Sequence, residues 1–147
     1  MKITICGSIA FQDEILFLKE KLEELGHEIK MWPSEVKDEK GQLIPVQEYY
    51  KIRHVAKESE KWVWDRKAEA VLRHFDKVAW SDAILVANYD KNNIKGHIGG
   101  NTLMEMGLAL FLKKKIYLLN EIPELSYKEE ILGVKPIILN GDLHKIT

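Results

Sequence analysis

The chain has 147 residues, of which 46% are hydrophobic, and this length and composition suit one buried core in a single domain spanning residues 1–147. Its 22 lysines and arginines nearly balance 23 acidic residues, and the formal net charge of -1 excludes the strong basic field that a nucleic-acid polymer would require. A single cysteine excludes an internal disulfide, and no signal-peptide pattern or apolar run of roughly 20 residues is present. We therefore expect a cytoplasmic protein that binds neither a membrane nor a nucleic acid.

The first predicted elements are a strand, a tight turn and an amphipathic helix. Lys2–Cys6 is a short β-branched run, and apolar residues at helical spacing occupy residues 15–25 before Gly26 stops the helix. The turn Gly7–Ala10 lies where open α/β sheets bind ligands, and its N–H groups and the Ser8 hydroxyl suit an anion. Taken alone, these residues favour an ordinary tight turn between a strand and a helix over an anion site.

The next segment predicts a strand, a polar loop and two helices. His27–Met31 reads as the strand, and the charged, glycine-containing stretch Pro33–Ile44 is typical of a surface loop that folds over a site. From Pro45 the pattern turns helical in two pieces. The tryptophans at 62, 64 and 80 favour a core or a dimer interface over a platform for stacking bases.

Three more strands complete an α/β pattern. Asp82–Ala87 is nearly all apolar, as is typical of a strand buried on both faces of a parallel sheet, and Lys115–Leu119 and Pro136–Leu139 follow it. A short helix is expected near Ser126. Strands alternating with helices predict a doubly wound, five-stranded parallel sheet of order 2-1-3-4-5, whose switch point lies between strands one and three.

The segment between the third and fourth strands combines a glycine loop with an apolar helix. The loop is Gly96–Asn101, and from Leu103 to Leu112 only Glu105 is polar, so we expect a helix buried nearly all round. Two interpretations of Glu105 remain open. Thr102-x-x-Glu105 is a capping-box pattern, whereas a carboxylate kept ionised by the helix dipole would serve as a nucleophile or an electrostatic stabiliser. The two can coexist.

Other chemistries lack their sequence signatures. The five histidines, at 27, 54, 74, 97 and 144, show no metal-ligand spacing, so no metal is expected. The chain has neither a Gly-x-Gly-x-x-Gly nor a Walker motif, and we expect no cofactor. Cys6 has no marked histidine partner, which favours a small buried hydrophobic residue over a nucleophile.

Three motifs resemble the nucleoside 2-deoxyribosyltransferase superfamily, which includes nucleoside-monophosphate N-glycosidases. They are Cys6-Gly7-Ser8, Ser81-Asp82 and Met104-Glu105-Met106-Gly107-Leu108-Ala109, and most of the chain takes part. The resemblance implies the sheet order given above and assigns Glu105 the attack on C1′ of the sugar. An ionised carboxylate suits the oxocarbenium-like state of such a reaction.

The resemblance also assigns further residues. His74 stands where members carry an aspartate, with Asp76 two residues on, so either is a candidate acid or base, and His74 equally suits a packed helix position. Gly99 stands where members carry a serine or aspartate, and Ser126 matches a residue that members contribute from a neighbouring subunit. The expected substrate-binding residues are Cys6, Gly7, Ser8, Ile9, Gly99, Gly100, Asn101, Thr102 and Ser126. The stretch Gly99–Thr102 with Glu105 also resembles, more locally, the nucleoside-monophosphate phosphoribohydrolases.

Together these observations predict an enzyme that cleaves or transfers at the N-glycosidic bond of a nucleoside or nucleoside 5′-monophosphate, with Glu105 as nucleophile. The alternative is a nucleotide-binding sensor or regulatory module with a degenerate site. We expect a homodimer or larger homo-oligomer, assembled through the helices around Trp62 to Phe75. A 5′-phosphate would bind at Ser8 and the backbone N–H groups of Gly99–Thr102.

Overall fold

A computed structural model describes residues 1–147 and contains one five-stranded parallel sheet. Its strands run in the order β2-β1-β5-β6-β7, with bounds Glu28–Lys30, Lys2–Cys6, Ala83–Val86, Lys115–Leu118 and Ile137–Ile138. This is the predicted order 2-1-3-4-5, so the α/β fold class is confirmed. No helix is long and apolar enough to cross a membrane.

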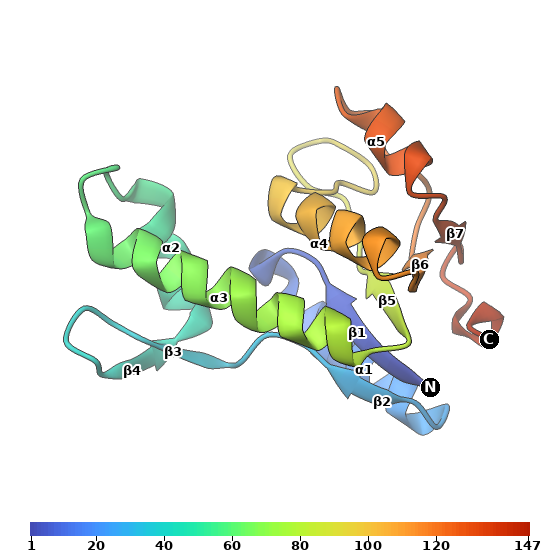
Figure 1. Ribbon diagram of the computed structural model, residues 1–147, viewed down its shortest axis with the longest axis horizontal. Coiled ribbons are helices and arrows are strands. Elements are labelled where there is room, and N and C mark those ends of the chain that lie inside the picture. The colour runs from blue at the N-terminus through green and yellow to red at the C-terminus, as the bar shows by residue number, and fades with distance from the viewer.

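The faces of the sheet follow from the alternation of side chains along each strand. Ile3 and Ile5 of β1 point to the face covered by α1 (Gln12–Glu24), where Gly26 ends the helix segment with φ +89°. Cys6 points to the opposite face, into a core shared with α3 (Lys61–Trp80), α4 (Gly100–Phe111) and α5 (Lys128–Gly133). Figure 1 shows α3 and α4 lying side by side across this face.

The prediction of a surface loop at Pro33–Ile44 is partly wrong, because this segment contains most of a two-stranded antiparallel hairpin. Strands β3 (Glu35–Lys37) and β4 (Leu43–Pro45) pair across a turn at Gly41, which has φ +82°. Asp38 stabilises that turn by accepting hydrogen bonds from the N–H groups of Lys40 and Gln42. The hairpin leads directly into α2 (Val46–Val55), and both lie at the end of the molecule away from α5 and β7 (Figure 1).

Helix α4 corrects two expectations. It is not buried all round: Met104 is 49% and Phe111 80% exposed. It also begins at Gly100 after an N-cap at Gly99 that makes no side-chain hydrogen bond, so Thr102 is already its third residue. The capping-box interpretation of Thr102-x-x-Glu105 is therefore wrong, and Glu105 needs another explanation.

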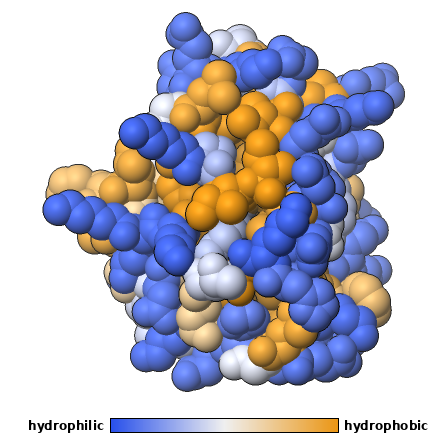
Figure 2. All heavy atoms as spheres, turned by 90° about the vertical axis from the view of Figure 1, so that its right-hand side faces the viewer, coloured by the Kyte–Doolittle hydropathy of each residue, from blue (hydrophilic) through white to orange (hydrophobic).

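Hydrophobic side chains also reach the surface near the other edge of the sheet. Leu132 of α5 is 49% and Ile137 of β7 44% exposed. Seen from the side of α5 and β7, hydrophobic atoms gather between clusters of charged side chains (Figure 2). This side and the exposed face of α4 are two of the places where a single copy of the chain leaves large hydrophobic side chains exposed.

Candidate active site

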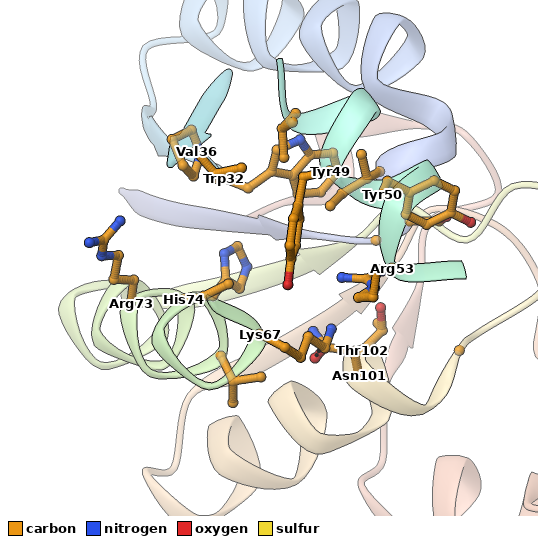
Figure 3. Close-up of a pocket in the computed structure, with 18 of the residues that line it drawn as sticks. Trp32, Val36, Tyr49, Tyr50, Arg53, Lys67, Arg73, His74, Asn101 and Thr102 are labelled. Atoms are coloured by element: carbon orange, nitrogen blue, oxygen red, sulfur yellow. Dashed lines mark hydrogen bonds between the residues drawn. The ribbon is translucent and has the colours of Figure 1, made fainter. Parts of the chain in front are cut away.

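A cavity of about 420 Å³ opens at the carboxyl ends of β1 and β5, the switch point of the sheet. Its walls come from the turn after β1, the β3–β4 hairpin, α2, α3 and the start of α4 (Figure 3). The sequence-predicted residues Gly7, Ser8, Ile9, Gly99, Gly100, Asn101, Thr102, His74 and Glu105 all line it. The structure thus brings the two predicted loop segments to one place.

Glu105 lies at the bottom of the cavity, with 2% of its surface exposed. Its Oε1 accepts a hydrogen bond from Asn101 Nδ2 at 3.1 Å, and Asn101 Oδ1 accepts one from Lys67 Nζ at 3.0 Å. Asn101 is one helical turn before Glu105, and Lys67 reaches it from α3. A chain of three polar side chains thus connects the two helices and fixes one carboxyl oxygen.

Burial sets the ionisation of this carboxyl group. It raises the pKa of Glu105 to about 8, although Asn101 and Lys67 act in the opposite direction. Burial likewise lowers the pKa of Lys67 to about 8. The expectation that the helix dipole keeps Glu105 ionised is wrong for the ligand-free protein, because Glu105 is the sixth residue of α4 rather than part of its first turn.

The other carboxyl oxygen of Glu105 faces His74. Their Oε2 and Nε2 atoms are 3.3 Å apart, and neither atom makes a hydrogen bond. Burial, reinforced by the charge of Lys77, lowers the pKa of His74 to about 4. The contact therefore joins two neutral groups and is not an ion pair.

Cys6 completes this cluster from the end of β1. Its thiol, the imidazole of His74 and the Glu105 carboxyl group have potential ligand atoms that all lie within 4.8 Å of one another. Burial and the neighbouring carboxyl raise the pKa of the thiol well above its usual value. We call Cys6, His74 and Glu105 the floor triad; it is the one set of residues here with the donor types and spacing to hold a metal ion.

The opening of the cavity carries a second polar cluster. Lys91 Nζ donates hydrogen bonds to Ser8 Oγ at 3.1 Å and to Tyr50 Oη at 2.9 Å. The guanidinium group of Arg53 lies over the ring of Tyr50, 5.3 Å from its centroid. We call Ser8, Tyr50 and Lys91 the mouth cluster. Figure 3 shows Tyr50 and Arg53 of α2 on the wall opposite Lys67 and Asn101.

Positive charge is concentrated around this cavity, although the whole chain has a net charge of -1. The cationic lining residues are Lys37, Arg53, Arg66, Lys67, Arg73, Lys77 and Lys91, whereas the acidic ones are Glu35, Glu69 and Glu105. Such an excess attracts an anionic ligand. The sequence analysis did not identify Lys91, Tyr50 or Arg53 as residues of the site. The only local pattern that could have indicated them is Arg53, one helical turn after the adjacent residues Tyr49 and Tyr50.

The loop that carries Lys91 is held by an asparagine and a glycine. Asn88 Nδ2 donates to the carbonyl oxygens of Gly96, Asn120 and Glu121 at 3.0–3.3 Å. Gly96 has φ +64°, and a Cβ there would lie 2.6 Å from the carbonyl oxygen of Glu121. The side chain of Asn88 thus ties the glycine loop to the segment after β6, and a Cβ at position 96 would clash with both Glu121 O and Asn88 Nδ2.

Gly99 and Gly100 differ from Gly96, since a Cβ at either would meet no backbone atom within 4 Å. The fold does not require glycine at these two cavity-lining positions. Their missing side chains leave room, and exposed N–H groups, for a ligand to approach the backbone at the start of α4.

Three predicted residues do not line the cavity: Cys6, whose buried thiol lies beside His74 and Glu105, and the exposed residues Asp76 and Ser126. Asp76 is exposed on α3 and does not line it, so the structure does not support a catalytic role for this residue. Ser126 is exposed in the turn before α5, also away from the cavity of its own chain. Its contribution to the site of a second subunit stays a prediction.

No protein-family model matches the chain, and no curated protein matches it. Among solved structures, a 2-deoxyribosyltransferase from Bacillus psychrosaccharolyticus is similar with a TM-score of 0.46 and 14% identity, over 80% of this chain and 71% of that one. A CMP N-glycosidase from Clostridium botulinum is similar with a TM-score of 0.48 and 18% identity, over 95% and 90%. Both are similarities of fold at low sequence identity.

Proposed function

We propose that this chain is a cytoplasmic enzyme that cleaves or transfers at the N-glycosidic bond of a nucleoside or nucleoside 5′-monophosphate, with Glu105 as the nucleophile. The observation that carries the proposal is a single carboxyl group buried at the bottom of a cavity whose opening is cationic. The motif around Glu105 supports the same assignment. A carboxylate in this position can attack one face of a sugar whose phosphate is held at the opening.

Glu105 must lose its proton before it can attack. His74 Nε2, 3.3 Å from Glu105 Oε2, is placed to accept that proton when a substrate fills the cavity and replaces bulk water. Positive charge developing on the sugar ring then stabilises the adjacent carboxylate, and this interaction is strong in a buried setting. The raised pKa in the free protein is consistent with a group that ionises only against its substrate.

The proposed reaction has two steps. A Glu105 oxygen bonds to C1′ while the bond from C1′ to the base nitrogen breaks, and the electron pair leaves with the base, which takes from His74 the proton that His74 had accepted from Glu105. Water, or a second base in a transfer reaction, then attacks C1′, gives its proton to His74 and releases the Glu105 carboxylate, to which His74 returns the proton. For hydrolysis the net change is one water consumed, one base and one sugar released.

The phosphate of the proposed substrate would bind at the opening. Ser8 Oγ and the N–H groups of Gly99–Thr102 offer donors, and Lys91 adds a positive charge within hydrogen-bond distance of Ser8. The twelve-residue helix α4 begins here and adds the positive end of its dipole. This support from Lys91 offsets the lack of a side-chain donor at Gly99.

The decisive experiment is release of free base. Nucleosides, 2′-deoxynucleosides, their 5′-monophosphates including CMP, and NAD are incubated with the protein and separated by chromatography. Base released by the wild type but not by Glu105→Gln supports the proposal. If the nucleotides bind in calorimetry and no base appears, the chain is instead the sensor or regulatory module that the sequence left as the alternative.

We also retain the expectation of a homo-oligomer. The prediction placed the interface on the helices around Trp62 to Phe75, and in this region Leu72 is 64% and Trp64 37% exposed. The neighbouring face of α4 exposes Phe111 and Met104. A second copy covering these side chains would remove them from water, and Ser126 stays the residue that we expect one subunit to contribute to the site of another. A monomer in sedimentation at working concentration would contradict this.

A further inference from the structure

We propose that the floor triad of Cys6, His74 and Glu105 is a binding site for a zinc-class divalent metal ion, with one coordination position open to the cavity. Three different elements supply the ligands: the end of β1, the middle of α3 and the second turn of α4. Thiolate, imidazole and carboxylate are the three donor types that zinc accepts in proteins. No feature of sequence spacing could reveal such a set, because the three residues are far apart in the chain.

Two atoms of the triad lack any other partner. His74 Nε2 and Glu105 Oε2 are buried, make no hydrogen bond and face each other at 3.3 Å. Buried polar atoms normally have partners, and an unsatisfied pair in a polar cluster needs an explanation. Ligand atoms held at about 2.1 Å from one zinc ion at the tetrahedral angle lie about 3.4 Å apart, which is close to the observed separation.

The remaining geometry is compatible with the same ion. All three potential ligand atoms lie within 4.8 Å of one another, so adjustments of side chains of about 1 Å bring Cys6 Sγ to the distance that a zinc–thiolate bond requires. His74 and Glu105 line the cavity, whereas Cys6 does not, so the fourth position points toward the substrate space. This pattern of three protein ligands and one open position is that of reactive zinc sites rather than structural ones.

The chemistry of the donors selects the metal. A thiolate and an imidazole favour zinc and related soft or borderline ions over magnesium and calcium, which prefer oxygen ligands. On binding, the thiol and the carboxyl group each release a proton, so the two resulting negative charges balance the dication within a buried site. Cys6 is therefore more than a small hydrophobic residue at the end of a strand.

Metal binding and glycosidic chemistry would compete for Glu105. An oxygen bonded to the metal cannot attack C1′, so zinc would inhibit the reaction proposed above. That inhibition rests on the proposed function, whereas the metal site does not. The two are separated by measuring binding instead of activity.

The test uses the purified protein after treatment with a chelator. We expect one zinc ion per chain in competition with a chromophoric chelator, and affinity at least about tenfold lower in Cys6→Ser, His74→Gln and Glu105→Gln. His54→Gln is the matched control, because His54 also lines the cavity but lies outside the floor triad. The zinc affinity of this variant should equal that of the wild type. Circular dichroism checks that each variant is folded.

Cobalt gives a readout that does not depend on any variant folding. Because Cys6 is the only cysteine in the chain, a thiolate-to-cobalt charge-transfer band in the wild-type protein can arise only from Cys6. Stoichiometric cobalt binding with this band supports the site. Absence of the band, or zinc affinity that is the same in wild type and His74→Gln, would overturn it, whether or not the protein cleaves nucleotides.

Discussion

The floor and the mouth of the cavity are both clusters of three polar side chains, but they differ in burial and in hydrogen bonding. In the floor triad, His74 Nε2 and Glu105 Oε2 are buried without hydrogen bonds. In the mouth cluster, Lys91 binds both Ser8 and Tyr50 within a half-exposed opening. Buried groups without hydrogen bonds are costly to keep, whereas hydrogen-bonded groups near solvent are available to a ligand at little cost. We infer that the floor provides reactivity and the mouth provides affinity.

The largest effect is expected for Glu105→Gln, which removes the reactive group of the floor. The amide keeps the shape and can still accept the hydrogen bond from Asn101, but it cannot attack C1′. We expect kcat for base release to fall by about 10³-fold or more while nucleotide binding changes little. The measurement is chromatography of released base combined with calorimetric titration.

Asp76→Asn provides the matched control for that experiment. It makes the same change from carboxylate to amide at an exposed position of α3 that does not line the cavity. Its turnover should remain within about twofold of the wild type, since surface substitutions of this kind have small effects. If both variants were equally impaired, or neither, Glu105 would not be the nucleophile.

The second prediction concerns how stability depends on pH in the metal-free protein. In the folded state the Glu105–His74 pair keeps one proton between pH values of about 4 and 8, because burial sets these as the pKa values of His74 and Glu105. In the unfolded chain the histidine releases its proton near pH 6.5. From pH 6.5 to 8 the folded state therefore binds more protons, so its stability falls as the pH rises.

The expected loss is about 2 kcal/mol across this window, from 1.36 kcal/mol for each pH unit. It is measured by urea unfolding with a chelator present. Cys6, Lys67 and Lys77 also face the pair. Because burial lowers the pKa of Lys67 to about 8, the titration of Lys67 affects stability only at the upper end of the pH 6.5–8 window. Subtracting the free energy of unfolding of Glu105→Gln from that of the wild type at each pH removes contributions common to both proteins. If the two curves of unfolding free energy against pH were parallel, Glu105 would not be buried and protonated in the folded state.

The floor and the mouth also differ in how far the sequence could predict them. The sheet order and Glu105 followed from alternating strands and helices and from one carboxyl group in an apolar helix. The ionisation of Glu105 did not, because burial by residues distant in the chain outweighs the local helix dipole. The start of α4 at Gly100 was missed because glycine has a low helix propensity, so its position in the first turn was not expected.

Most of the mouth cluster could not be predicted from the sequence. Lys91 and Tyr50 are 41 residues apart and meet only because α2 and the loop after β5 reach the same opening. The β3–β4 hairpin was missed because its three-residue strands are too short to show an alternating pattern. Pairings that depend on tertiary structure leave no period or spacing to detect, whereas Glu105 lies in a motif that is local.

The third prediction tests the mouth directly through Lys91→Met. Methionine keeps most of the length of the side chain and removes its charge. We expect KM for a nucleoside 5′-monophosphate to rise by about tenfold, while KM for the matching nucleoside changes by less than about twofold. Comparing steady-state kinetics for the two substrates gives the result. Equal effects on both substrates would mean that no anion binds beside Ser8.

The smallest expected effect is that of Tyr50→Phe, which removes one hydroxyl group from the mouth cluster. The side chain is half-buried, and its oxygen accepts a hydrogen bond from Lys91 at 2.9 Å. This bond and the neighbouring positive charges of Lys91 and Arg53 hold the pKa of Tyr50 below its usual value, although burial opposes them. Without the hydroxyl, Lys91 keeps Ser8 as a partner, so we expect KM for the monophosphate to rise by only about threefold, equivalent to a typical hydrogen bond of about 0.7 kcal/mol.

In the double variant with Lys91→Met the Tyr50→Phe substitution should add almost nothing, because the hydroxyl acts by positioning the ammonium group. A full threefold effect that persists in the double variant would show that Tyr50 contacts the ligand itself.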